Sequence, residues 1–452
     1  MKHLFEQTLR RITAAIAVVA ALTACSSNPD SANVSGDVKV LAPMNDDKAA
    51  SHYSLQFIEL LGLNNLQEVS GKFVHFFFSP RIVNNHLDGV APKGRFIRNT
   101  NGNYVPANDL SQQMTVIYAH MQRLAQMDVD LGAEGINQWP RDVGVGVRVT
   151  GGMDNNAFYD GKTDSMLFVP YTQADLPIAV NGGILAHEHF HSLFYKIVLK
   201  GLAEDATVHD REFFLKNAGI EEIDTKDDSK SGETKTEPKE SNRIVDMTRP
   251  QLIATDDDIH AAYQKTLLRG INEGMADFWG WVYTGNPDFI ASSLPSEKSA
   301  RSLSVSGTRG LDWLPTELSV KRSVSTYMTY DLNQTQYLTG YAYTVGTQYS
   351  RVMKGFADLI ASNRGLDSLT ARRQVAKWLL ASLATLRSDV EKSSDGSYYN
   401  PGNFVQGFVG AIPDLQEKEC NYWMAVMNNS ISSSDKKQTC KQDGSWKLVP
   451  AE

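Results

Sequence analysis

Five consecutive residues near the middle of the chain, His187-Glu188-His189-Phe190-His191, have the types and spacing of a metal site. Histidines four residues apart lie on the same face of a helix, so His187 and His191 can reach one ion. Glu188 is next to the first of them and can act on a water molecule at an open coordination position. His189 points roughly 200° away around the helix, so we do not expect it to bind the ion. The alternative is a helix with three histidines in ordinary structural hydrogen bonds.

A catalytic zinc ion usually has three protein ligands and one water, so this pattern needs a further ligand. No other histidine lies close to His191 along the chain, since the next ones are His209 and His260. The best candidate is Glu273, which is followed four residues later by Asp277. On a helix these two carboxylates share one face. The alternative interpretation is an amphipathic helix whose two acids form salt bridges.

The H-E-x-x-H pattern and Asn272-Glu273-x-x-Ala276-Asp277 together resemble the two helix motifs of gluzincins, especially the thermolysin-like zinc peptidases. The resemblance implies a zincin-type α+β fold and one catalytic Zn²⁺ with three ligands, His187, His191 and Glu273. It also implies that Asp277 holds His187 in the correct orientation. Glu188 would then be the general base and acid of peptide-bond hydrolysis.

The segment Asn155–Gly161 is similar to the edge strand that pairs with the substrate in thermolysin-like enzymes. The resemblance implies that the Asn156 side chain and the Ala157 carbonyl hold a peptide; a plain hairpin is the alternative. Arg301, in Arg301-Ser302-Leu303-Ser304, resembles the family arginine that binds a substrate carbonyl. A lone arginine is also a common surface charge.

Two tyrosines are candidates for stabilising the transition state. Tyr263 precedes Glu273 at nearly the spacing of a tyrosine that has this role in the family. Thermolysin-like enzymes also use a downstream histidine, but this chain has none after His260. Tyr343 could replace it by donating its hydroxyl to the developing oxyanion, as tyrosines do in other gluzincins. Core packing is the alternative for Tyr343.

The N-terminus has the pattern of an export signal. A basic start that ends at Arg11 is followed by the apolar run Ile12–Leu22, which is too short to span a bilayer. Leu22-Thr23-Ala24-Cys25 resembles the lipobox of bacterial lipoproteins, which implies cleavage before Cys25 and lipidation of its sulfur. Ser26 stands where aspartate would favour the inner membrane, so we expect the outer membrane. An ordinary secretory signal is the alternative.

Only two other cysteines are present, Cys420 and Cys440. In an exported chain a remaining pair of this kind predicts a disulfide, with two reduced thiols as the alternative. Neither cysteine is near the histidine motif, so a thiolate zinc site is not expected.

The pattern along the chain predicts an α/β lobe followed by a helical lobe. Expected elements are strands at 74–78 and 143–149, a helix at 114–127, a hairpin at 152–170 and the metal-binding helix at 177–199. Residues 216–250 form a polar, disordered insertion in this prediction, which accounts for part of the long interval between the two zinc motifs. The predicted regions are a signal peptide (1–24), a lipidated flexible tether (25–50), an N-terminal α/β lobe (51–215), the insertion and a helical C-terminal lobe (251–452).

The composition narrows the choice of partners. The net charge is −8 and no basic stripe is present, which argues against a nucleic-acid partner. The acidic clusters Asp227-Asp228 and Asp256-Asp257-Asp258 could bind Ca²⁺, but such clusters are more often solvated surface and no other residue pattern supports a calcium site.

We therefore expect a zinc-dependent peptidase that acts on peptides or proteins and is held to a membrane through Cys25. One alternative is a surface lipoprotein that binds peptides on a gluzincin scaffold without cutting them. The presence of Glu188 disfavours this alternative. Another is a metal-dependent hydrolase of non-peptide amides. Substrate preference, endo- or exopeptidase action and oligomeric state are open at this stage.

Overall fold

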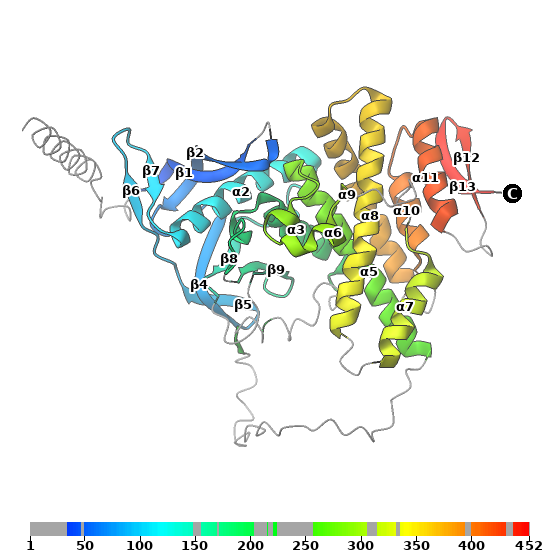
Figure 1. Cartoon of the computed structure of the whole chain (residues 1–452), viewed down its shortest axis with the longest axis horizontal. Helices are drawn as coiled ribbons and strands as arrows, with labels where there is room; N and C mark the ends of the chain where they lie inside the picture. The colour runs from blue at the N-terminus through cyan, green and yellow to red at the C-terminus, as the bar shows by residue number, and fades with distance from the viewer. Residues whose placement is uncertain are drawn as a thin grey trace, which may run out of the picture.

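The computed structural model describes residues 34–46, 49–147, 155–169, 171–202, 215, 220–223, 256–304, 314–330, 335–393, 399–430 and 437–451. Within these ranges the chain is a mixed α/β protein with sheets in its N-terminal part and helices in its C-terminal part (Figure 1). The expected signal peptide, Cys25 and the Asp227-Asp228 pair lie outside the described residues. Among the described helices, none combines the length and the apolar composition that crossing a bilayer requires.

The first sheet contains five strands in the order β3-β2-β1-β7-β6. Their bounds are Gly36–Asp46 (β1), Ala49–Asn65 (β2), Ser70–Gly71 (β3), Phe96–Arg98 (β6) and Tyr104–Pro106 (β7). β1 shows that the flexible tether predicted at 25–50 is wrong from Gly36 onward. The reason is a period-two pattern: Val38, Val40, Ala42 and Met44 are buried under the sheet, while the residues between them are not.

The second sheet has the order β11-β4-β8-β10-β9, and β5 pairs with β4. Its strands are Val74–Val83 (β4), His86–Val90 (β5), Arg141–Val145 (β8), Ala157–Asp160 (β9), Ser165–Phe168 (β10) and Glu222–Ile223 (β11). The predicted hairpin is confirmed as β9 and β10, which are antiparallel with β9 at the edge. β11 pairs with β4, so the insertion predicted from residue 216 begins too early. Its larger part, 224–250, lies outside the described residues.

Two helices of the N-terminal part position the histidines. The helix predicted at 114–127 is confirmed within α2 (Asp109–Leu131), which contacts the first sheet and the next helix. The single helix expected at 177–199 is instead three elements: η2 (Ile178–Val180), α3 (Gly182–Phe194) and the π-helical turn η3 (Tyr195–Leu199). The break occurs because Asn181 is extended and its side chain accepts the backbone N–H groups of Gly183 and Ile184, which starts a new helix.

The C-terminal part consists mainly of helices, as predicted. They are α5 (Asp256–Thr284), η6 (Ile290–Ser292), η7 (Pro295–Glu297), α6 (Lys298–Arg301), α7 (Glu317–Tyr330), α8 (Thr335–Arg364), α9 (Ser368–Ser393), α10 (Pro401–Gly410) and α11 (Glu417–Ser430). Asp256, Asp257 and Asp258 are exposed in the first turn of α5. α5 and α8 approach closely because Gly274 lies against the backbone of Gly346, where a Cβ atom would collide.

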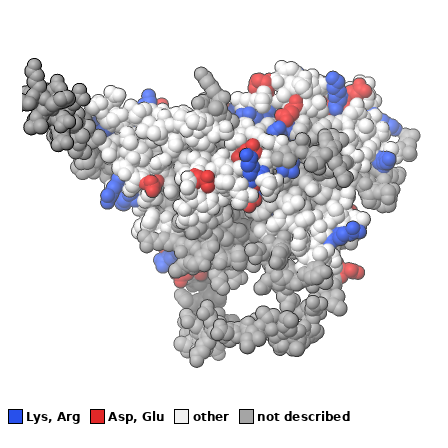
Figure 2. Space-filling model, in the orientation of Figure 1, with Lys and Arg blue, Asp and Glu red and all other residues white. Residues whose placement is uncertain are grey.

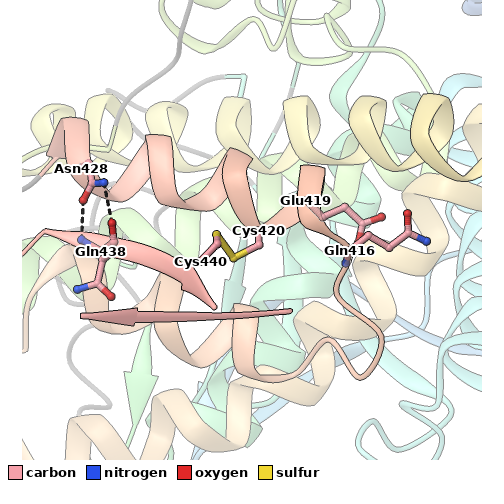
Figure 3. Close-up of a disulfide and its surroundings, with 6 residues drawn as sticks. All are labelled: Gln416, Glu419, Cys420, Asn428, Gln438 and Cys440. Atoms are coloured by element: carbon pink, nitrogen blue, oxygen red, sulfur yellow. Dashed lines mark hydrogen bonds between the residues drawn. A yellow bond between two sulfur atoms is a disulfide. The ribbon is translucent and has the colours of Figure 1, made fainter. Parts of the chain in front are cut away.

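A β-hairpin that the sequence did not predict closes the C-terminal part, with strands Gln438–Asp443 (β12) and Ser445–Pro450 (β13). The predicted disulfide between Cys420 and Cys440 is confirmed, and it joins α11 to β12 (Figure 3). Asn428 of α11 also exchanges two hydrogen bonds with the backbone of Gln438 (Figure 3). The hairpin is therefore fixed to α11 at two points.

Candidate metal centre

The histidine motif lies in a helix that is buried along its whole length. All thirteen residues of α3 are buried. Asn181 fixes its first turn, because the side-chain amide also donates to the carbonyl of Phe289 and to Ser293. Gly183 allows the close approach of the Phe289 ring, which a Cβ atom would block. α3 is thereby held against α5, which carries Glu273.

His187, Glu188 and His191 form a buried group that could hold a metal ion, with ligand atoms all within 4.8 Å of one another. The Nε2 atoms of His187 and His191 are 3.0 Å apart. The Oε2 atom of Glu273 lies 3.4 Å from the first and 3.7 Å from the second. Three ligands at tetrahedral positions around zinc, with bonds of about 2.0–2.1 Å, are roughly 3.4 Å apart. The spacing of these atoms therefore fits a common ion.

The other nitrogen of each ring faces an oxygen atom of α5. Nδ1 of His187 lies 2.9 Å from Oδ1 of Asp277, the contact that the sequence predicted. Nδ1 of His191 lies 3.0 Å from Oδ1 of Asn272. An imidazole that donates from Nδ1 has an unprotonated Nε2. When both rings are neutral in this way, the two Nε2 lone pairs are directed toward the same space, where a proton or a metal ion can bind them.

The buried carboxylates also favour a cation at this site. Glu188 and Glu273 are each 5% exposed. Among the described residues, Oε2 of Glu273 has no hydrogen-bond donor. Burial raises the pKa of Glu188 to about 8, which shows how poorly solvated this carboxylate is. Burial lowers the pKa of His187, but Asp277 and Glu273 raise it to about 9. The site thus attracts positive charge, and a divalent ion would balance the two glutamates.

Arg301 lies at the candidate metal centre, beside Asp277 and Glu273. Its Nη2 and Nε atoms donate to the two carboxylate oxygens of Asp277, at 2.6 and 3.2 Å. Nη2 also lies 3.9 Å from Oε2 of Glu273. The guanidinium is therefore engaged with Asp277, and its contact with a substrate carbonyl stays a prediction. Arg301 is the last residue of the short helix α6, and the sequence around it has no metal-binding pattern.

Of the two candidate tyrosines, Tyr343 lies beside the candidate metal site and Tyr263 does not. The guanidinium of Arg301 lies over the ring of Tyr343, with 4.4 Å between the guanidinium carbon and the ring centre. Burial raises the pKa of Tyr343 well above its ordinary value, and Glu273 and Glu188 raise it further, so the hydroxyl stays protonated beside the site. Tyr263 donates its hydroxyl to the carbonyl of Tyr399 and is completely buried. Ten residues of helix separate it from Glu273, about 15 Å along the axis. The predicted catalytic role of Tyr263 is therefore wrong.

β9 lies against α3. The backbone N–H of Tyr159 donates a hydrogen bond to the Glu188 carboxylate. Asn156 pairs with Val169 through its carbonyl, so in antiparallel alternation Ala157 and Tyr159 direct their backbone groups away from β10. The Asn156 side chain accepts the N–H of Ala157. The strand predicted to hold substrate is thus next to the candidate metal site.

On the other side of α3, His189 belongs to a separate polar cluster that sequence reasoning missed. Its Nε2 atom lies 2.8 Å from Oδ1 of Asp128 in α2, and its ring stacks on Trp139. As predicted, it does not join the other two histidines. Asn137 accepts hydrogen bonds from Ser192 and from Arg141 in the same region. These contacts fix the back of α3 to α2 and to the segment before β8.

Asp164, in the turn between β9 and β10, is the centre of a second set of contacts. Arg141 and Lys196 form ion pairs with its two oxygens at 2.9 and 2.7 Å. The hydroxyl of Tyr159 donates to it at 2.9 Å. Burial raises the pKa of Asp164, but these two cations lower it below its ordinary value. Asp164 thus anchors Tyr159, whose backbone N–H holds Glu188.

The arrangement has the parts that metal-assisted hydrolysis requires: a place for one cation, a poorly solvated carboxylate beside it, a protonated tyrosine and a strand with outward-facing backbone groups. No protein-family model matches the sequence, and no curated protein matches it either.

Proposed function

We propose that this protein is a zinc-dependent peptidase of the gluzincin type. One observation carries the proposal: two histidine Nε2 atoms and a glutamate oxygen converge within 3.0–3.7 Å, while both Nδ1 atoms face oxygen acceptors. Two imidazoles and one carboxylate are a common ligand set of catalytic zinc. Neither sulfur ligands nor a cage of many oxygens is present in the described part of the site, which favours zinc over copper(I) or calcium.

His187, His191 and Glu273 would hold the ion, and Asp277 and Asn272 would orient the two rings. A bound zinc ion would supply Lewis acidity and lower the pKa of a water ligand toward about 7. Glu188 would accept a proton from the attacking water and pass it to the leaving amine. Its pKa of about 8 in the metal-free chain reflects burial, and a nearby cation would favour the ionised base. Tyr343 would donate its hydroxyl to the developing oxyanion.

A peptide substrate is favoured by β9. An edge strand next to the catalytic carboxylate can pair with an extended peptide through main-chain hydrogen bonds. The backbone of Ala157 faces away from β10 and is therefore correctly oriented for such pairing. A non-peptide amide would not need this strand.

The test compares the wild-type chain with the Glu188→Gln and Glu273→Ala variants. We expect about one zinc per chain in the wild type and in Glu188→Gln, and strongly reduced zinc in Glu273→Ala. Turnover of a mixed peptide library should fall by at least 10³-fold in Glu188→Gln, because general base catalysis and water orientation are lost together. Near-wild-type turnover in Glu188→Gln would refute the assignment. Zinc with peptide affinity but no turnover in the wild type would indicate the non-catalytic binding protein.

We also propose that Cys25 is lipidated and holds the chain on a membrane, with the outer membrane as the expected location. The lipobox pattern Leu22-Thr23-Ala24-Cys25 supports this proposal. Labelling with a fatty-acid analogue in cells should modify the wild-type chain and leave Cys25→Ser unlabelled. Equal labelling of both chains would contradict the proposal.

A further inference from the structure

The first sheet has apolar residues on both faces, and among the described helices α2 packs against its inner face. Its inner face contributes Val38, Val40, Ala42 and Met44 to the main core, where α2 packs. A half-covered sheet normally alternates apolar and polar residues along each strand. Here the outward positions of the central strands carry apolar residues as well. In Figure 1, β1 and β2 run along the upper left margin of the molecule with α2 beneath them.

The strand register aligns these outward side chains in rows. Ile97 of β6 pairs with Val105 of β7, and Leu41 of β1 pairs with Phe57 of β2. β1 and β7 are parallel, with Val40 opposite Tyr104. The next residue of each strand, Leu41 and Val105, is therefore also aligned, and the row continues across four strands. A second row joins Pro43 to Leu55. None of these six side chains packs against the main core. We call Ile97, Val105, Leu41, Phe57, Pro43 and Leu55 the outer sheet patch.

Two residues of the outer sheet patch are exposed to solvent, and the other four are partly buried. Leu55 is 68% exposed and Phe57 is 42% exposed, and Leu61 beyond them is 40% exposed. Isolated exposed apolar residues need no explanation, but a contiguous apolar area on a sheet usually marks a surface that binds something. Figure 2 shows this margin of the lobe as largely uncharged, with isolated charged side chains.

The position of Cys25 indicates the occupant. Gly36, where β1 begins, is eleven positions after Cys25, and eleven positions span at most about 40 Å when the chain is fully extended. A lipid anchor at Cys25 therefore keeps the first sheet within that distance of the bilayer. The patch has a basic residue on each side: Lys39 lies next to its first row, opposite Glu59, and Arg95 precedes β6. Cations beside an apolar surface are suited to lipid phosphates at the membrane interface.

We propose that the outer sheet patch lies on the membrane that holds Cys25, with Phe57 and Leu55 inserted among the lipid head groups and upper acyl chains. This inference rests on the proposed lipidation and is independent of the peptidase activity. One lipid anchor and one apolar sheet face together fix the orientation of the first lobe, which a flexible anchor alone would leave free. The chain would therefore act on substrates from a defined side.

The experiment places an environment-sensitive fluorophore at Phe57→Cys in the full lipidated chain. The control carries the same probe at Lys447→Cys, on the hairpin at the opposite end of the molecule, where the side chain is 53% exposed (Figure 1). Cys420 and Cys440 are joined in the disulfide and should not react. Both chains are reconstituted into vesicles of phosphatidylethanolamine and phosphatidylglycerol. We expect a blue shift and quenching by bilayer-embedded quenchers at position 57, and neither effect at position 447.

A second measurement uses Cys25→Ser, which has no lipid anchor, with and without Leu55→Asn and Phe57→Asn. The two apolar replacements should lower binding to the same vesicles at least tenfold while zinc content and turnover in detergent stay unchanged. If the chain floats with vesicles but the fluorophore at position 57 keeps the emission of a probe in water, the docking proposal is overturned and the lipidation proposal stands. A full chain that does not float overturns both. The fluorophore at position 57 could also be shielded from water in detergent, while sedimentation shows a dimer. That result would mean that the outer sheet patch binds a second copy of the chain, and it overturns membrane docking.

Discussion

Replacement of Asp277 by asparagine tests whether the contact with His187 serves metal binding. Oδ1 of Asp277 lies 2.9 Å from Nδ1 of His187, and both carboxylate oxygens also accept from Arg301. Asparagine keeps one acceptor oxygen, which at the place of Oδ1 can still face His187 and Nη2 of Arg301, but its amide group then replaces the acceptor of Arg301 Nε. Its amide N–H₂ would then oppose another donor. The side chain is buried, so water cannot repair the mismatch.

The expected loss follows from this geometry. Removal of a carboxylate that orients a metal-binding histidine typically lowers metal affinity about 10–100-fold, which is roughly 1.4–2.7 kcal/mol. We expect the upper part of that range, because Asp277→Asn also leaves Arg301 with an uncompensated charge close to the ion. Glu273→Gln should cost more, since it replaces a direct ligand.

The assay is a zinc competition titration with a chelator of known affinity, on Asp277→Asn and on the control Asp358→Asn, an exposed aspartate of α8. Thermal unfolding with and without excess zinc separates weak metal binding from poor folding, because zinc stabilises only chains that bind it. The control should match the wild type. A folded Asp277→Asn variant with wild-type zinc affinity would refute the proposed role of the contact.

Three further predictions concern other parts of the structure. Tyr343→Phe should keep zinc affinity and KM while lowering kcat about 10²-fold, the usual effect of removing an oxyanion donor; an unchanged kcat in steady-state assays would exclude this role. Gly274→Ala should destabilise the chain by about 2 kcal/mol or more and weaken zinc binding, because the methyl group forces α8 away from α5 beside Glu273; Gly340→Ala, which has open space around it, is the control in thermal unfolding. Glu419→Gln should cost about 3 kcal/mol at pH 7, because Glu419 is buried and paired with Arg364. Although burial raises the pKa of Glu419, the hydrogen bonds from Arg364 lower it below its ordinary value, so this stabilisation is present above pH of about 4.3 and is lost as pH falls further. Denaturation of both chains between pH 7 and pH 3 should therefore show a shrinking difference, and a constant difference would contradict the assignment.

The local part of the site could be predicted because it is encoded by helical spacing. The side chains of His187 and His191 are neighbours in any α-helix, and so are those of Glu273 and Asp277. Once the two helices pack together, the contact between His187 and Asp277 follows. The hairpin β9–β10 could also be predicted from the sequence, because turn residues separate two apolar runs.

The errors arose where distance along the chain conceals a tertiary contact. The tether prediction is wrong over β1 because Asp, Pro and Lys are common in residues 26–50, although every second residue from Val38 to Met44 is apolar. The contact of Arg301 with Asp277 could not be predicted, because Asp277 lies on another helix and no spacing rule connects the two residues. Tyr263 fitted a spacing, but the helix turns its hydroxyl toward Tyr399.

His189 shows why the support of a site is harder to predict than its ligands. It lies between the two histidines of the motif, yet its partner Asp128 belongs to α2 and no spacing rule connects the two residues. The stacked ring and the contact with Asp128 occupy the face of α3 that an amphipathic helix would normally fill with apolar side chains. A buried polar contact of this kind gains little net stability but is costly to misplace, because either partner alone would be a buried polar group without a hydrogen bond. The back of α3 therefore has few alternative packings, and this restricts where His187 and His191 can point on the other face.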